Sequence, residues 1–200
     1  MSKSDSRASL DRRELLKVGA AGLGLGAAAG LTPMFAAAYD DTHAQERPAL
    51  GPAPATPFAS DPIDVVRVGF VGVGGMGGAH VRNYLGIEGV EIVALCDINE
   101  ARNEQVASWV TDAGQAPPAM YGRDETDFVR MCETEELDLV MTATPWEWHV
   151  PVCVAAMEND KHAATEVPAA YTTDDCWKLV EYAEKHDKHC VMMENCNYDR

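Results

Sequence analysis

From residue 65 onward, short apolar runs alternate with segments in which apolar residues recur every three or four positions. The first pattern predicts buried β-strands and the second predicts amphipathic helices. The predicted strands are residues 66–71, 91–96, a very short 121–123, 137–142, 162–165 and 190–194. The predicted helices are residues 77–86, 100–113, 124–134 with Asp124 as its cap, 151–159 and 173–186. This strict alternation indicates an α/β fold with a doubly wound parallel sheet that is covered on both faces.

The first predicted strand runs directly into a glycine-rich turn of the form Gly-x-Gly-x-x-Gly, which consists of Gly72, Val73, Gly74, Gly75, Met76 and Gly77. The first glycine permits a tight turn, the second lets the backbone approach a pyrophosphate, and the third lets the helix pack closely on the strand. Asp97 ends the next apolar run, 20 residues after Gly77, where a carboxylate binds ribose hydroxyls and repels a 2′-phosphate. These features predict a Rossmann-type domain that binds NAD rather than NADP. The alternative is a glycine-rich loop beside an ordinary strand.

Polar and aromatic residues follow three consecutive predicted strands. They are Thr-Pro-Trp-Glu-Trp-His at 144–149, Glu-Val-Pro at 166–168 and Glu-Asn-Cys-Asn-Tyr at 194–198. Each has an ordinary structural explanation, such as core packing for the tryptophans, a helix cap for His149 or a salt bridge for Glu166. Because they gather at the carboxyl edge of the sheet, where the nicotinamide is expected, we interpret them jointly as functional.

The first 38 residues have the pattern of a twin-arginine signal peptide. Arg12 and Arg13 precede an uncharged run rich in Gly, Ala and Leu, which closes on small residues before an expected cleavage near Ala38. The alternative is a membrane anchor, but the glycines of the run lower its hydrophobicity and helix propensity. We therefore expect contact with the twin-arginine export machinery and a periplasmic or extracellular location. That pathway carries folded proteins, which suits a domain that takes up its cofactor in the cytosol.

Residues 39–61 contain four prolines and no strand or helix period, which predicts a Pro/Ala-rich linker before a cofactor domain at 62–200. The chain has 16 basic and 32 acidic residues and a net charge of -16, so nucleic acid is not an expected partner. The six cysteines form no C-x-x-C pair and favour buried thiols. No metal site is expected, because the ligand spacing of zinc sites is missing from the sequence.

These motifs resemble the N-terminal domain of the Gfo/Idh/MocA superfamily of NAD(P)-dependent oxidoreductases, from about residue 65 to 200. Thr-Pro-Trp-Glu-Trp-His, Glu-Val-Pro-Ala-Ala, Cys-Trp-Lys-Leu-Val and Met-Met-Glu-Asn-Cys-Asn-Tyr are most similar to glycoside hydrolase family 109. Members of that family are NAD-dependent α-N-acetylgalactosaminidases. The resemblance implies that a bound NAD oxidises carbon 3 of the sugar, after which elimination, water addition and re-reduction complete hydrolysis, unlike the two-carboxylate mechanism of most glycosidases.

The resemblance also implies roles for single residues. It places Gly75 and Met76 at the pyrophosphate and Asp97 at the ribose. The residues that it implies beside the cofactor and toward the nicotinamide are Trp146, Glu147, Trp148, His149, Glu166, Val167 and Asn195. For catalytic proton transfer the first candidate is Tyr198, whose phenol would need a pKa below its usual value near 10, and the second is His149.

Val167 stands where sugar dehydrogenases of the superfamily have a proton-transferring lysine. Because valine carries no proton, this position favours the glycosidase interpretation. Two alternatives stay open at this point. One is an NAD-dependent sugar or inositol dehydrogenase, and the other is a non-catalytic NAD-binding module.

The sequence ends at a predicted strand end. The resemblance implies a further C-terminal α/β domain, which in the superfamily supplies sugar contacts and often the oligomer interface. We therefore expect these 200 residues to be a fragment of a longer protein. The glycoside substrate would then be gripped by residues beyond Arg200.

Overall fold

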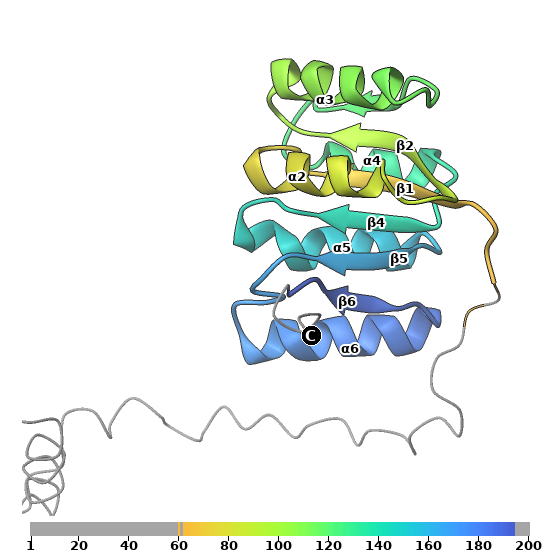
Figure 1. Cartoon of the computed structure of the whole chain (residues 1–200). Helices are drawn as coiled ribbons and strands as arrows, with labels where there is room; N and C mark the ends of the chain where they lie inside the picture. Colours follow the sequence, from red (N-terminus) through yellow and green to blue (C-terminus); the bar gives the residue numbers. More distant parts are fainter. Residues whose placement is uncertain (1–59, 61, 195–200) are drawn as a thin grey trace, which may run out of the picture. The chain divides into compact units, whose positions relative to one another are not determined.

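The computed structural model describes residue 60 and residues 62–194 (Figure 1). The predicted signal peptide at 1–38 and all but one residue of the predicted 39–61 linker lie outside the described residues. The same is true of Asn195 and Tyr198. The predictions made for these segments therefore stay predictions.

The described part forms a single parallel sheet of six strands with the order β3-β2-β1-β4-β5-β6. The strands are β1 Val66–Val71, β2 Val90–Cys96, β3 Ala119–Tyr121, β4 Leu139–Thr142, β5 His162–Thr165 and β6 Cys190–Met192. Every pair of neighbouring strands is parallel. This is the strand order of a Rossmann fold, in which the chain reverses direction across the sheet next to β1. The predicted fold class is confirmed.

Helices cover both faces of this sheet. They are α2 Gly75–Tyr84, α3 Glu100–Asp112, α4 Asp127–Thr134, α5 His149–Glu158 and α6 Thr173–His186, with a 3-10 turn η2 at Trp146–Trp148. Apolar side chains of α2 and α3 pack on one face, where Phe70 and Leu95 are fully buried. Those of α4, α5 and α6 share a second core with Val71 and Val140 on the other face. Figure 1 shows α2 in front of the strands and α4 and α5 behind them.

Several predicted boundaries shift. Asp124 does not cap α4; it accepts hydrogen bonds from the backbone N–H (2.8 Å) and hydroxyl (2.7 Å) of Thr126 in the preceding turn. The helix starts at Asp127, whose carboxylate accepts from the N–H of Gly122 at 2.7 Å. α5 starts at His149 rather than 151, because Pro151 fits the first turn of a helix, where no N–H is needed.

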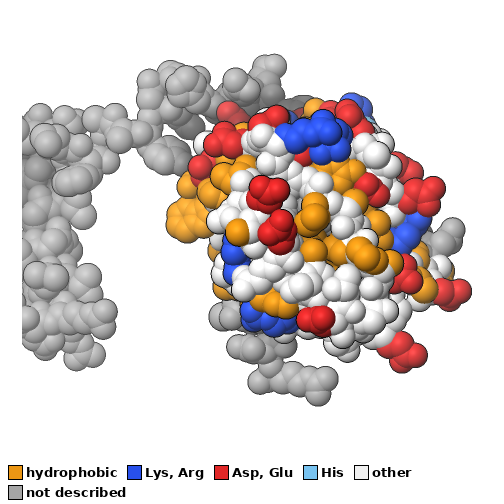
Figure 2. Space-filling model, turned by 90° about the horizontal axis from the view of Figure 1, so that it is seen from above, with side chains coloured by type: hydrophobic (Ala, Val, Ile, Leu, Met, Phe, Trp, Pro, Cys, Tyr) orange, Lys and Arg blue, Asp and Glu red, His pale blue; other side chains and the backbone are white. Residues whose placement is uncertain are grey.

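The remaining shifts are small. The structure has α2 at 75–84 instead of 77–86, β3 at 119–121 instead of 121–123, and shorter β4 and β6. α2 starts early because the glycine turn itself supplies its first residues. Of the described cysteines all are free thiols, and Cys96, Cys132 and Cys153 are buried as predicted, whereas Cys176 is exposed. On the face seen in Figure 2, acidic side chains are scattered among basic and apolar ones and form no continuous patch.

Candidate functional site

Two glycines fix the turn between β1 and α2. Gly72 has a φ of +78°, and a Cβ there would lie 2.9 Å from the carbonyl carbon and oxygen of Ala143 after β4. A Cβ on Gly77 would collide with the carbonyl oxygen of Gly72. The first position therefore needs glycine for its backbone conformation, and the second needs it for the close approach of helix and strand.

The neighbouring glycines leave a cradle at the start of α2. A Cβ added to Gly74 or Gly75 would meet nothing within 4 Å, so both positions face open space. Gly74 is the N-cap and carries no side-chain cap, and no acidic residue stands in the first turn. Backbone N–H groups and the positive end of the helix dipole therefore face this space and suit a pyrophosphate. Met76, 58% exposed, lies in the same first turn.

A side chain that directly follows β2 and another on α3 hold the turn in shape. The Asp97 carboxylate accepts hydrogen bonds from the N–H groups of Val73 and Asn99, both at 2.8 Å. The Arg102 guanidinium donates to the carbonyl oxygens of Val73 at 3.1 Å and of Gly74 at 2.8 Å. Because a carboxylate oxygen has two lone pairs, Asp97 can still accept hydrogen bonds from ribose hydroxyls. The turn is thus organised by protein contacts alone.

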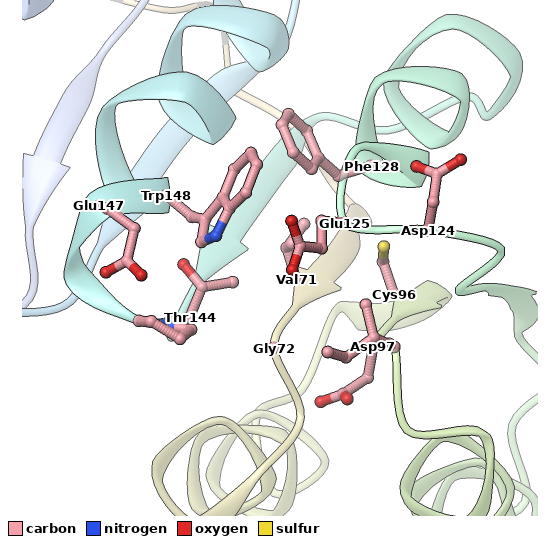
Figure 3. A pocket seen from close by; sticks show the side chains of 12 residues that line it. Val71, Gly72, Cys96, Asp97, Asp124, Glu125, Phe128, Thr144, Glu147 and Trp148 are labelled. Carbon is pink, nitrogen blue, oxygen red and sulfur yellow. The ribbon is translucent and has the colours of Figure 1, made fainter.

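A pocket opens beside this turn, between the ends of β1, β2 and β4 (Figure 3). Phe128 and Trp148 contribute aromatic rings, which pack edge to face with centroids 6.0 Å apart. The carboxylates that line the pocket are Asp97, Asp124, Glu125 and Glu147. Such a negative lining would repel a 2′-phosphate and therefore favours NAD over NADP.

Cys96 also lines this pocket. Burial, followed by the nearby charges of Asp127 and Asp97, raises the pKa of its thiol to about 12. The side chain therefore stays a neutral thiol at physiological pH and contributes an apolar wall rather than a nucleophile.

The residues after β4 separate in space. Glu147 and Trp148 line the pocket, and their predicted contact with the cofactor stays a prediction. Trp146 is 54% exposed and contacts Tyr171 with ring centroids 5.8 Å apart, and it does not line the pocket. Its predicted contact with the cofactor stays a prediction.

His149, which the sequence predicts as a catalytic and cofactor-binding residue, is enclosed by the protein. Its side chain is fully buried. Its ring nitrogens lie 2.7 Å (Nδ1) from the carbonyl oxygen of Pro168 and 3.1 Å (Nε2) from that of Thr144. These contacts make His149 a structural link between the loops after β4 and β5, and its predicted catalytic and cofactor-binding roles stay predictions.

Glu166 and Val167 follow β5. One carboxylate oxygen of Glu166 pairs with Nε2 of His80 on α2, and the other accepts from the Val167 N–H at 3.3 Å. The Val167 side chain is 39% exposed. The structure therefore brings Glu166 close to the helix that starts at the glycine turn, while Asn195 and Tyr198 lie outside the described residues.

Sequence reasoning missed the contributions of His80, Arg102, Glu125 and Phe128. The sequence places His80 three residues after Gly77 on the predicted helix, but its partner Glu166 lies 86 positions away. The sequence therefore gives no sign of the pairing. Among the described residues, no group of three or more His, Cys, Asp or Glu side chains could hold a metal ion. No helix in that part of the chain is long and apolar enough to cross a membrane.

Comparison with known proteins adds to this geometry. The sequence profile of the GFO_IDH_MocA family, described as an oxidoreductase family with an NAD-binding Rossmann fold, matches residues 66–194. A glycosyl hydrolase family 109 protein of Shewanella pealeana is 39% identical over 96% of this chain and 41% of its own length. One of Saccharopolyspora erythraea is 39% identical over 100% of this chain and 42% of its own length. The chain thus spans about two fifths of the length of these curated relatives.

Solved structures show the same fold. The scyllo-inositol dehydrogenase of Lactobacillus casei with bound NAD(H) and scyllo-inositol is 18% identical, with a TM-score of 0.59. The match covers 68% of this chain and 38% of that one. At this identity the likeness supports the fold and no particular substrate.

Proposed function

Because this chain belongs to the Gfo/Idh/MocA family of oxidoreductases with an NAD-binding Rossmann domain, we propose that it is the cofactor domain of an NAD-dependent glycosidase. The proposed substrates are α-N-acetylgalactosaminides. The two family 109 relatives support this choice through their names and their identity of 39%.

The observation that carries the proposal is Val167. It directly follows Glu166 at the carboxyl edge of the sheet and presents methyl groups, 39% exposed, at the place where a sugar dehydrogenase of the superfamily has lysine. A direct alcohol oxidation needs a group that takes the hydroxyl proton, and valine cannot supply it. The proposed glycosidase also oxidises an alcohol, at carbon 3, and the resemblance to family 109 implies that a residue other than 167 takes that proton.

The residues of this chain have separable tasks in such an enzyme. Gly74 and Gly75 would admit the pyrophosphate, and Asp97 would accept the ribose hydroxyls. When bound, NAD would supply reversible hydride transfer at carbon 3 of the sugar, with the hydroxyl proton passing to and from a residue other than Val167, so that the cofactor is unchanged after each turnover. Tyr198 is the residue we propose for proton transfer at carbon 2, where a ketone at carbon 3 makes the proton acidic.

The N-terminal residues bear on where the enzyme meets its substrate. We propose that residues 1–38 direct export through the twin-arginine machinery, so that the glycoside is met outside the cytoplasm. An exported enzyme has no cytosolic NAD pool to draw on. It therefore needs a cofactor that is held tightly and regenerated in each turnover, as the proposed reaction provides.

The experiment uses the complete reading frame that contains these residues, with nitrophenyl α- and β-N-acetylgalactosaminides in heavy water and no added NAD. We expect nitrophenol release from the α-anomer and deuterium at carbon 2 of the released sugar. The control reaction contains free N-acetylgalactosamine and added NAD, and no NADH should accumulate in it.

The opposite pattern would contradict the proposal. If no glycoside is cleaved and NADH accumulates with free sugars or inositols, the protein is a dehydrogenase. Cleavage without deuterium at carbon 2 would instead exclude the oxidative route. Tyr198→Phe then tests the proton-transfer assignment, because it should lower the rate of deuterium uptake while the protein keeps its NAD.

A further inference from the structure

A histidine on the glycine-turn helix is paired with a carboxylate at the end of a distant strand. His80 lies on α2, three residues after Gly77, and its Nε2 contacts a carboxylate oxygen of Glu166, the residue that follows β5. Their side chains are 16% and 19% exposed, so the pair is largely shielded from water. A contact of this kind is stronger than one at the open surface, because water competes with it less.

The sheet order says where this pair lies relative to a dinucleotide. β1 lies between β2 and β4, and a dinucleotide crosses the edge of a doubly wound sheet at this reversal point. A dinucleotide bound in this way would place its adenosine half at the pocket lined by Asp97, because that half lies over the end of β2 in Rossmann folds. Glu166, which follows β5 on the other side of β1, then lies on the nicotinamide half.

The two oxygens of the Glu166 carboxylate are in different situations. One is engaged by His80, and the other accepts a long hydrogen bond of 3.3 Å from the N–H of Val167. A free glutamate side chain samples several rotamers, and holding it in one of them has an entropic cost. The contact with His80 removes this freedom before a ligand arrives.

We propose that His80 is a positioning residue for the cofactor. Its Nε2 holds the Glu166 carboxylate in one orientation, so that the second oxygen accepts a hydrogen bond from the nicotinamide half of NAD. The proposal deepens the proposed function but depends only on NAD binding, so it holds for a glycosidase and for a dehydrogenase.

The test compares His80→Leu with His80→Gln and His80→Asn in the complete protein. Glutamine places an amide nitrogen near the position of Nε2, whereas asparagine is too short to do so. We expect H80L and H80N to lose NAD about tenfold faster than the wild type, as the loss of a hydrogen bond to a charged group predicts, and H80Q to stay close to the wild type. The measurements are the NAD retained after dialysis and its rate of release, followed by protein fluorescence without any sugar.

Asn83→Leu is the matched control, because Asn83 is an exposed residue of the same helix whose side chain makes no hydrogen bond within the described residues. A double-mutant cycle with Glu166→Ala then tests the route of the effect. If His80 acts through Glu166, H80L should have little further effect on NAD release in the E166A background.

Two results would overturn the proposal. One is equal loss of NAD in H80Q and H80L, and the other is an undiminished effect of H80L after Glu166 is removed. If H80L does not fold, the comparison of H80N with H80Q decides in the same way. Because no sugar is present in these measurements, a missing glycosidase activity cannot be mistaken for either result.

Discussion

The carboxyl edge of this sheet has two halves that differ in how firmly the protein holds them. At the ends of β1 and β2, the carboxylate of Asp97 and the guanidinium of Arg102 bind the backbone of the glycine turn from two sides. At the ends of β4 and β5, three large side chains stand in solvent: Trp146 is 54% exposed, Val167 39% and Tyr171 59%. In the first half, the backbone of the glycine turn is already held in one conformation. In the second half, the exposed side chains lie on loops that follow β4 and β5.

This difference separates binding from chemistry. A rigid first half fixes the adenosine and pyrophosphate at little entropic cost, because the turn has its shape already. An open second half leaves space around the reactive end of the cofactor for a substrate and for residues from elsewhere. Among the described residues, the glycine turn is therefore held by side-chain contacts, whereas Trp146, Val167 and Tyr171 are exposed.

The largest effect should come from a substitution that breaks the first half. Gly77→Ala forces a methyl group against the carbonyl oxygen of Gly72, and we expect it to destabilise the domain by about 3 kcal/mol. Urea unfolding followed by circular dichroism measures this loss.

Gly75→Ala is the matched partner, because its methyl group would enter open space. Its stability should be equal to or above that of the wild type, since alanine favours a helix, while NAD binding should weaken because the methyl group occupies the cradle. Equal stability of the two variants would show that the close packing of α2 on β1 is not the constraint at residue 77.

The second effect concerns the base of the open half. His149→Leu removes the ring that donates to one of the carbonyl oxygens of Pro168 and Thr144, and we expect a stability loss of about 2 kcal/mol. A neutral imidazole donates only one N–H, so part of the stability that His149 contributes comes from the packing of its fully buried ring. A variant of unchanged stability that has lost only its catalytic rate would instead support the predicted catalytic role of His149.

The sequence was sufficient for the fold because its signals are local. The run from Val66 to Val71 and the glycine turn lie within one stretch of chain, and the structure has the predicted strand and turn there. Asp124 was misjudged because a carboxylate before a helix can cap either the helix or the preceding turn, and the choice depends on Asp127. Helix starts are decided by such competing short contacts.

The site was only partly predictable, since its contacts join distant residues. Asp97 could be predicted because an acidic residue directly after the second strand of a Rossmann fold has a fixed place relative to the glycine turn. The partner of Glu166 could not be found, because His80 comes from another helix and no spacing rule links them. Burial was equally hidden: the sequence places His149 and Trp146 in one segment, but the 3-10 turn directs one into the core and the other into solvent.

The third effect tests the selectivity of the first half. Asp97→Asn keeps an acceptor oxygen but removes the charge, and we expect NAD to bind about tenfold more weakly because hydrogen bonds to charged groups are the stronger ones. The ratio of NADP affinity to NAD affinity should be higher in the variant than in the wild type, since less negative charge opposes the 2′-phosphate of NADP. Asp112→Asn, at the other end of α3, makes the same change in net charge and should alter neither affinity. Calorimetric titration with both cofactors measures the ratio, and an unchanged ratio would exclude Asp97 as the selecting group.

The smallest expected effect is a pH dependence of stability at His162. This residue begins β5 and therefore lies at the amino edge of the sheet, opposite the candidate site. Burial, and then the charges of His189 and Lys188, lower the pKa of His162 below its ordinary value of 6.5, against the opposing pull of Asp138 and Asp160. Its Nδ1 accepts a hydrogen bond from the His189 N–H at 3.0 Å, which protonation there would break. The unfolded chain then binds the proton more readily, so the stability that His162 contributes is full above 6.5 and falls as the pH drops below it. Thermal unfolding of wild type and His162→Gln between about pH 7 and about pH 5 should show a shallower decline in the variant. Identical slopes would assign the acid sensitivity to other titrating groups.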